Sequence, residues 1–82
     1  MPELVLYMKP RCHLCHDAAV LLARLGEEYS FTLREVDITS DPTLHEAHGD
    51  YIPVVSLEGT TVLMAPFGEA LARQVLTRML GP

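Results

Sequence analysis

The sequence predicts an α/β fold in which a four-stranded mixed sheet is flanked by helices. Short apolar and β-branched runs alternate with stretches whose apolar residues recur at helical spacing, in the order β-α-β-α-β-β-α. No repeat, low-complexity tract or linker interrupts the 82 residues, so we expect one domain over residues 1–82. Hydrophobic residues make up 49% of the chain, which is sufficient for a core without a framework of disulfides.

The first half of the chain predicts a strand–helix–strand unit. Leu4–Met8 is a short apolar run, typical of a strand buried on both faces. Between Leu14 and Leu25 the apolar residues follow one helical stripe, and Gly26 is the expected end of that helix. Residues 31–38 are rich in β-branched and aromatic side chains and predict a second strand. Because a crossover helix connects them, the two strands are expected to be parallel.

The second half predicts a short helix, a hairpin and a terminal helix. Asp41 is a suitable N-cap before Pro42, and Gly49 lies beyond a helix of about two turns. The apolar runs 54–57 and 60–63 flank a two-residue turn that ends in glycine, which is a hairpin signal. The terminal helix carries a broad apolar face made of Leu71, Ala72, Val75, Leu76, Met79 and Leu80.

Composition and charge exclude several classes of protein. The net charge is −5 and only six Lys and Arg are present, so a nucleic-acid binder is not expected. No apolar run approaches the length that spans a membrane, and the first residues lack the features of a signal peptide. Two cysteines three positions apart are too few for a secreted disulfide framework. We therefore expect a cytoplasmic protein that binds neither nucleic acid nor membrane.

Cys12 and Cys15 carry the predicted chemistry. Their spacing puts them on one helix face with Cβ atoms about 5–6 Å apart, close to disulfide reach. Cys12 lies at the strand-to-helix junction, where free N–H groups, the helix dipole and the charges of Lys9 and Arg11 favour a thiolate. Cys15 lies one turn inside the helix and is expected to be buried. This pattern predicts a thiol–disulfide oxidoreductase with Cys12 as nucleophile and Cys15 as resolving thiol.

Two further residues are candidates for the site. Pro53 stands between Ile52 and an apolar run, and because proline cannot donate to a sheet ladder it belongs at a strand start or edge. A cis bond there would turn the Ile52 backbone toward the cysteines, whereas an ordinary trans proline beginning an edge strand fits equally well. His13, when protonated, would stabilise the thiolate of Cys12; the alternative is an inert exposed ring.

A family resemblance is carried by two segments, 7–15 (YMKPRCHLC) and 51–54 (YIPV). They resemble the glutaredoxin-like branch of the thioredoxin superfamily, and the resemblance covers nearly the whole chain in length and element order. It implies the thioredoxin fold, a cis Pro53 facing the active site, and Cys12 as the nucleophile. It also implies that Lys9 and the backbone of Ile52 contact glutathione, which would serve as a co-substrate; no bound cofactor is predicted.

The sequence departs from the family pattern at the positions that bind glutathione. His13 replaces the usual proline after the first cysteine, and Leu14 replaces the aromatic residue before the second. Residues 64–67 stand where the family has a Gly-Gly pair and an acidic residue that hold the glutamyl end. We therefore predict weak or no glutathione-dependent activity, despite Lys9. The expected partners are disulfide-containing proteins or small thiols, with glutathione or a thioredoxin-reductase-type enzyme as reductant.

Three other functions fit parts of the sequence. Residues 12–16 (CHLCH) match the c-type haem attachment pattern, but the predicted strands and the absence of an export signal disfavour a haem protein. A thioredoxin-fold module that binds a partner without turnover could use a groove near Pro53. Zinc, or an iron–sulfur cluster shared between subunits, could use a ligand set drawn from Cys12, Cys15, His16, His45 and His48.

Overall fold

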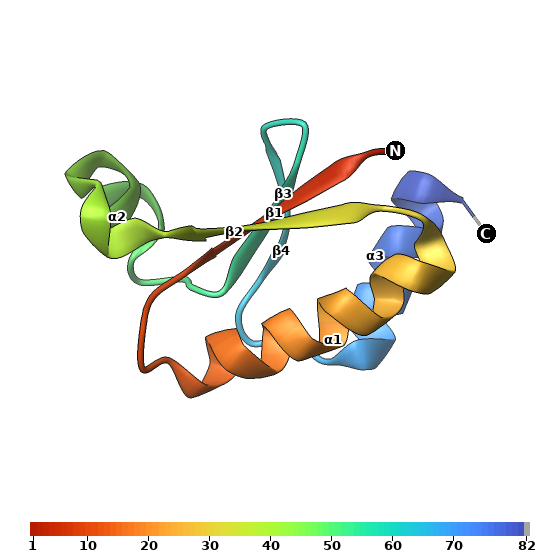
Figure 1. The fold of residues 1–82 in the computed structure, drawn as a ribbon, viewed down its shortest axis with the longest axis horizontal. Coiled ribbons are helices and arrows are strands. Elements are labelled where there is room, and N and C mark those ends of the chain that lie inside the picture. The colour runs from red at the N-terminus through yellow and green to blue at the C-terminus, as the bar shows by residue number, and fades with distance from the viewer. Residues whose placement is uncertain (82) are drawn as a thin grey trace.

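The computed structural model describes residues 1–81 and confirms the predicted order of elements (Figure 1). The strands are β1 (Glu3–Met8), β2 (Thr32–Asp37), β3 (Val54–Leu57) and β4 (Thr60–Met64). The helices are α1 (His13–Tyr29), α2 (Pro42–His48) and α3 (Glu69–Leu80), with a short 3-10 turn (Ile38–Ser40) before α2. The sheet order is β2-β1-β3-β4; β1 and β2 are parallel, and the other two pairs are antiparallel. None of the helices in this part of the chain is long and apolar enough to cross a membrane.

Helices α1 and α3 cover one face of the sheet (Figure 1). Leu4 and Leu6 of β1 face these helices and are fully buried, whereas Val5 and Tyr7 point to the other face and are half-buried. The expectation of a strand buried on both faces is therefore wrong. The other face receives the short helix α2 near one end, where the ring of His48 stacks on Tyr7 with centroids 4.3 Å apart. The core comprises Leu4, Leu6, Ala18, Leu22, Leu25, Phe31, Val55, Leu57, Leu63, Ala72 and Leu76.

The end of α1 differs from the prediction. The helix continues past Gly26 to Tyr29, and Ser30 caps it in the left-handed conformation with φ 58°. The backbone N–H groups of Ser30 and Phe31 both donate to the Gly26 carbonyl oxygen. A Cβ atom on Gly26 would lie 3.2 Å from the carbonyl oxygen of Phe31. Gly26 therefore does not end the helix. Its missing side chain allows the residues after the helix to fold back closely over it.

The predicted apolar face of α3 is narrower than expected. Ala72 and Leu76 are buried in the core, whereas Leu71 and Met79 are 44% and 45% exposed. The helix packs on α1 and the sheet along one stripe, so the side chains at the margins of the apolar face remain in contact with solvent.

Four charged side chains join α1 to α3. Arg24 Nη2 donates to Glu69 Oε1 at 2.6 Å, and Arg73 Nε donates to Glu69 Oε2 at 2.8 Å. Arg73 also binds Glu28 in a bidentate pair with N–O distances of 3.1 and 2.9 Å. The hydrogen bonds from Arg24 and then Arg73 lower the pKa of Glu69 from 4.5 to about 2.

We expect Glu69→Gln to lower the free energy of unfolding at neutral pH. Because the pKa of Glu69 is lower in the folded protein than its ordinary value of 4.5, the stabilisation is complete above that pH and is lost as the pH falls toward about 2. Urea unfolding of both proteins should show a difference that shrinks over this range and in 1 M salt, since the groups are exposed. The control is Glu27→Gln, which removes an exposed acidic side chain of α1. A difference that stays constant down to pH 2 would contradict the assignment.

Candidate redox site

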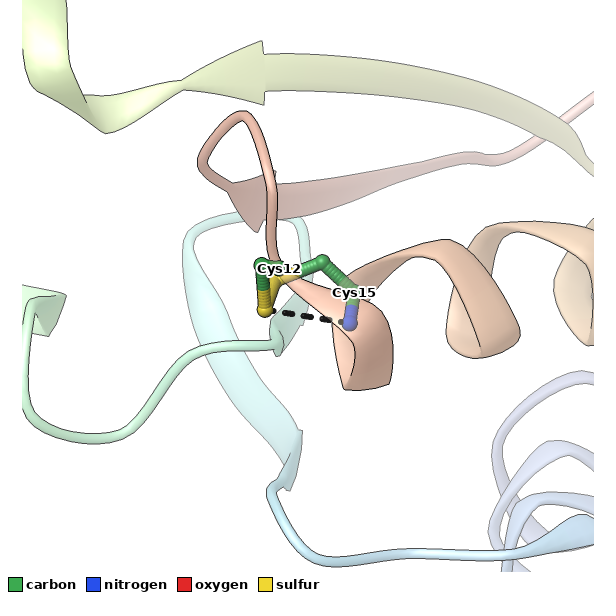
Figure 2. The surroundings of a disulfide bond; sticks show 2 residues. All are labelled: Cys12 and Cys15. Atoms are coloured by element: carbon green, nitrogen blue, oxygen red, sulfur yellow. Dashed lines mark hydrogen bonds between the residues drawn. A yellow bond between two sulfur atoms is a disulfide. The ribbon is translucent and has the colours of Figure 1, made fainter.

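The first cysteine caps the helix that follows β1. The chain turns through Lys9, Pro10 and Arg11, and Arg11 has a φ of 61°, which is uncommon for a residue other than glycine. Cys12 then adopts an extended conformation as the N-cap of α1. Its Sγ accepts a hydrogen bond from the backbone N–H of Cys15 at 3.2 Å (Figure 2). The helix N-terminus thus directs a donor at the Cys12 sulfur, in the way that an N-cap side chain is normally bound.

The two cysteines differ in exposure. They form a disulfide bond with a Cα–Cα distance of 5.2 Å, and the Cys12 side is half-buried whereas Cys15 is 1% exposed. Cys15 lies on the buried face of α1, together with Ala18 and Leu22. Cys12 is therefore the cysteine that a molecule in solution can reach.

A hollow on the β2 side of the cysteines, which we call the basic hollow, contains two of the predicted site residues. Lys9 and Arg11 line it beside both cysteines. Glu35 of β2 also lines it; sequence reasoning did not single out this residue, because only the parallel pairing of β1 and β2 brings it to the cysteines. The lining residues are Met8, Lys9, Pro10, Arg11, Cys12, Cys15, His16, Ala19 and Glu35.

A second depression, which we call the Pro53 groove, lies between α1 and the segments that flank the hairpin. The peptide bonds before Pro53 and Pro66 are both cis. The backbone N–H of Ala65 donates to the carbonyl oxygen of Pro53 at 3.0 Å and joins the segment after β4 to the one before β3. The groove is lined by Leu14, Asp17, Ala18, Leu21, Pro53, Ala65, Pro66, Phe67 and Gly68.

Leu14 belongs to this groove and not to the core. The helical spacing predicted that it would be buried with the other apolar residues of α1, but its side chain is 54% exposed. Residues 65–67, which had no assigned role, form the facing wall. The signal in the sequence was an apolar run interrupted by a second proline, but it did not indicate which part of the chain the run would face.

The basic hollow and the Pro53 groove lie on different sides of α1. The helix positions that line the groove are 14, 17, 18 and 21, whereas those that line the basic hollow are 15, 16 and 19. At 3.6 residues per turn these two sets point in roughly opposite directions. The structure therefore places Lys9 and Arg11 in a different depression from Pro53, and Cys12, at the start of the helix, lines the basic hollow.

His13 and Ile52 line neither depression. The His13 side chain is 87% exposed, and its Nε2 lies 3.4 Å from Oδ2 of Asp17. Ile52 is half-buried, and the backbone hydrogen bonds of residues 1–81 include none made by its N–H or C=O group. Pro53 directly precedes β3, a central strand and not an edge strand. The antiparallel pair Tyr7–Val54 brings this segment to the end of β1 from which the chain turns toward Cys12.

Of the histidines proposed as alternative metal ligands, His16 lines the basic hollow with the cysteines, whereas His45 and His48 lie on α2. Within residues 1–81, no group of three or more His, Cys, Asp or Glu side chains is arranged to hold a metal ion. His45 is exposed, and His48 packs on Tyr7 of the sheet. His48 is therefore not the fully solvated side chain that its place on a short polar helix indicates.

Comparisons with known proteins agree with this geometry. The glutaredoxin-like domain (DUF836) model matches residues 3–80. An uncharacterized protein of Mycobacterium tuberculosis is 33% identical over 63 residues, which are 71% of this chain but only 65% of that relative. A protein from X. campestris solved by X-ray crystallography has a TM-score of 0.79 and 31% identity, with 92% of this chain and 96% of the other covered. The oxidised thioredoxin of Plasmodium falciparum has a TM-score of 0.69 at 15% identity, covering 96% and 81%, and it supports the thioredoxin fold alone.

Proposed function

Because this chain belongs to the family of glutaredoxin-like domains (DUF836), we propose that it is a thiol–disulfide oxidoreductase of the cytoplasm. In this proposal Cys12 is the nucleophile and Cys15 the resolving thiol. The proposal rests mainly on the difference in solvent exposure between the two cysteines. Cys12 is accessible at the N-terminus of α1 and accepts a hydrogen bond from the backbone, whereas Cys15 is 1% exposed. A disulfide with a purely structural role does not require one cysteine to be more exposed than the other.

The reduced protein would begin the reaction with a thiolate at Cys12. The N–H of Cys15, the helix dipole and the nearby charges of Lys9 and Arg11 all favour negative charge on this sulfur. The thiolate attacks one sulfur of a substrate disulfide, a bond forms between Cys12 and that sulfur, and the other substrate sulfur leaves as a thiolate that takes a proton from water.

The second step would return the protein to the disulfide form. Cys15 gives its proton to water and its thiolate attacks the Cys12 sulfur of the mixed disulfide. The Cys12–Cys15 bond forms as the bond between Cys12 and the substrate sulfur breaks, and the remaining substrate half leaves as a thiolate that takes a proton from water. The substrate disulfide has then gained two electrons and two protons, and the protein holds the disulfide that Figure 2 shows. A thiol reductant must return two electrons before the next cycle.

The segment around Pro53 would hold the substrate. The Ile52 backbone makes no hydrogen bond to the rest of the described backbone, so it can pair with an extended stretch of a substrate protein. The location of this segment at the end of β1 supports the same role, since that is where the chain enters the cysteine turn. Disulfide-containing proteins and small thiols remain the proposed partners.

The test is a disulfide-reduction assay with two alternative electron sources. With dithiothreitol as reductant, we expect the protein to accelerate the reduction of a protein disulfide. With glutathione as the only reductant, we expect turnover at least about tenfold slower, because Lys9 is separated from Pro53 and the glycine pair that holds the glutamyl end is absent. Absence of acceleration with either reductant would contradict the proposed function. Fast glutathione-fed turnover that collapses in Lys9→Ala would leave the function intact but show that glutathione is the physiological donor.

A further inference from the structure

The Pro53 groove is a mainly apolar depression at the N-terminal end of α1. Six of its lining residues have apolar side chains; Leu14 and Pro66 are exposed, Leu21, Ala65 and Phe67 are half-buried, and Pro53 is buried. Leu14 lies in the first turn of α1, two residues after the N-cap Cys12, so the groove lies at the same end of the helix as Cys12. An apolar depression close to a reactive centre is typical of a substrate-binding site.

The size of the groove favours a side chain over a small-molecule ligand. Its volume is about 180 Å³, whereas sites that enclose small-molecule ligands usually measure about 300–1,000 Å³. A groove this small can hold one apolar side chain of a polypeptide whose backbone runs past the cysteines. The unpaired Ile52 backbone, next to Pro53 of the groove, supplies the matching contact for such a backbone.

The charge of the groove favours a basic residue in the ligand. Asp17 is the only charged residue among those that line it, and the basic residues Lys9 and Arg11 lie in the hollow on the opposite side of α1. A ligand carboxylate in the groove would therefore be repelled by Asp17; the ring of His13, whose Nε2 lies 3.4 Å from Asp17 Oδ2, is 87% exposed and lies outside the lining. The ammonium of a lysine or the guanidinium of an arginine would be attracted.

We propose that the Pro53 groove selects protein disulfides in which an apolar residue and a basic residue flank the half-cystine that Cys12 attacks. The apolar side chain enters the groove between Leu14 and Phe67, and the basic side chain faces Asp17. This inference rests on the proposed function and gives it a substrate class. It also gives a reason for discrimination against glutathione disulfide, each half of which carries two carboxylates.

The test uses the Cys15→Ser protein and symmetric disulfides of three blocked tripeptides. Their sequences are leucine–cysteine–lysine, leucine–cysteine–glutamate and serine–cysteine–lysine. The readout is the ratio of the rates at which mixed disulfides form, measured by mass spectrometry, because a ratio cancels any general change in the reactivity of Cys12. We expect the lysine peptide to react about three- to tenfold faster than the glutamate peptide at low salt. We expect the leucine peptide to react several-fold faster than the serine peptide.

Two variants should change these ratios in different ways. Adding Asp17→Lys should abolish or reverse the preference for lysine over glutamate, and adding Leu14→Glu should remove the preference for leucine over serine. Glu27→Lys makes the same charge change farther along α1, and Val20→Glu alters a side chain that is 57% exposed, close to the value for Leu14, but lines neither depression. Both controls should leave the ratios unchanged.

The outcomes separate this inference from the function on which it rests. If peptides are trapped but the ratios are near one, or are unchanged by Asp17→Lys and Leu14→Glu, the groove does not select the substrate and the oxidoreductase assignment stands. Equal shifts in the control variants would also contradict the inference. If Cys15→Ser traps none of the peptides, the proposed function fails and this inference fails with it.

Discussion

Cys12→Ser is expected to abolish disulfide reduction, with a loss of about a thousandfold or more, because a serine hydroxyl is not ionised at neutral pH and cannot replace a thiolate. This variant removes the sulfur of the more exposed cysteine and leaves that of the buried one. Cys12 is the sulfur that is accessible and that accepts a hydrogen bond from the N–H of Cys15. The measurement is the rate of protein-disulfide reduction fed by dithiothreitol, compared with that of the unaltered protein.

Cys15→Ser is the matched comparison, because it changes the same atom three residues away. This variant should keep the first attack and lose the second step, so that a mixed disulfide accumulates and turnover depends on the external thiol. A metal site predicts comparable damage from both substitutions, since both sulfurs would be equivalent ligands. Equal rates for Cys12→Ser and Cys15→Ser would therefore contradict the division of roles between the two residues.

Leu22→Ala is expected to cost roughly 2–5 kcal/mol of unfolding free energy, because it leaves a cavity in the core. Leu22 is fully buried on α1, in the cluster that joins this helix to the sheet and to α3. A domain of this size has a total stability of about 5–15 kcal/mol, so the loss is a large share of the whole. The measurement is urea unfolding of the oxidised protein, in which the Cys12–Cys15 bond is present in both variants.

Val20→Ala on the same helix is the control for this prediction. Its side chain is exposed, so the change should stay within about 0.5 kcal/mol. A similar loss in both variants would show that helix propensity and not core packing determines the effect. A loss below about 1 kcal/mol for Leu22→Ala would show that α1 is not held by the core as described.

The sequence predicted the elements whose signals are local. The apolar run of β1, the cap formed by Asp41 and Pro42, and the glycine-containing turn of the hairpin each depend on neighbouring residues, and each is present in the structure. The position of Cys12 at the start of a helix followed from the same kind of signal. The parallel β1–β2 pair and the β3–β4 hairpin followed from the crossover rule and the turn signal, whereas the pairing of β1 with β3 was not predicted.

The predictions that failed depended on which residues pack against a position, which its residue type and helical period do not indicate. Glycine is common at helix ends, but Gly26 lies within α1, where the absence of a side chain allows the backbone of Phe31 to approach closely. Leu14 matches the period of a core residue, yet it borders a groove whose other wall, residues 65–67, lies some fifty positions further along the chain. Periodicity describes which residues share a helix face and does not describe what covers that face.

The division of roles between the two cysteines is tested by the mass spectrum of the intact Cys15→Ser protein after mixing with a disulfide substrate. We expect one covalent adduct per chain, with the mass of one substrate half, located at Cys12 and removed by dithiothreitol. The Cys12→Ser protein, treated identically, should remain unmodified because its remaining sulfur is the buried one. Adducts of equal yield on both single-cysteine proteins, or on neither, would contradict the assignment of Cys12 as the nucleophile and Cys15 as the resolving thiol.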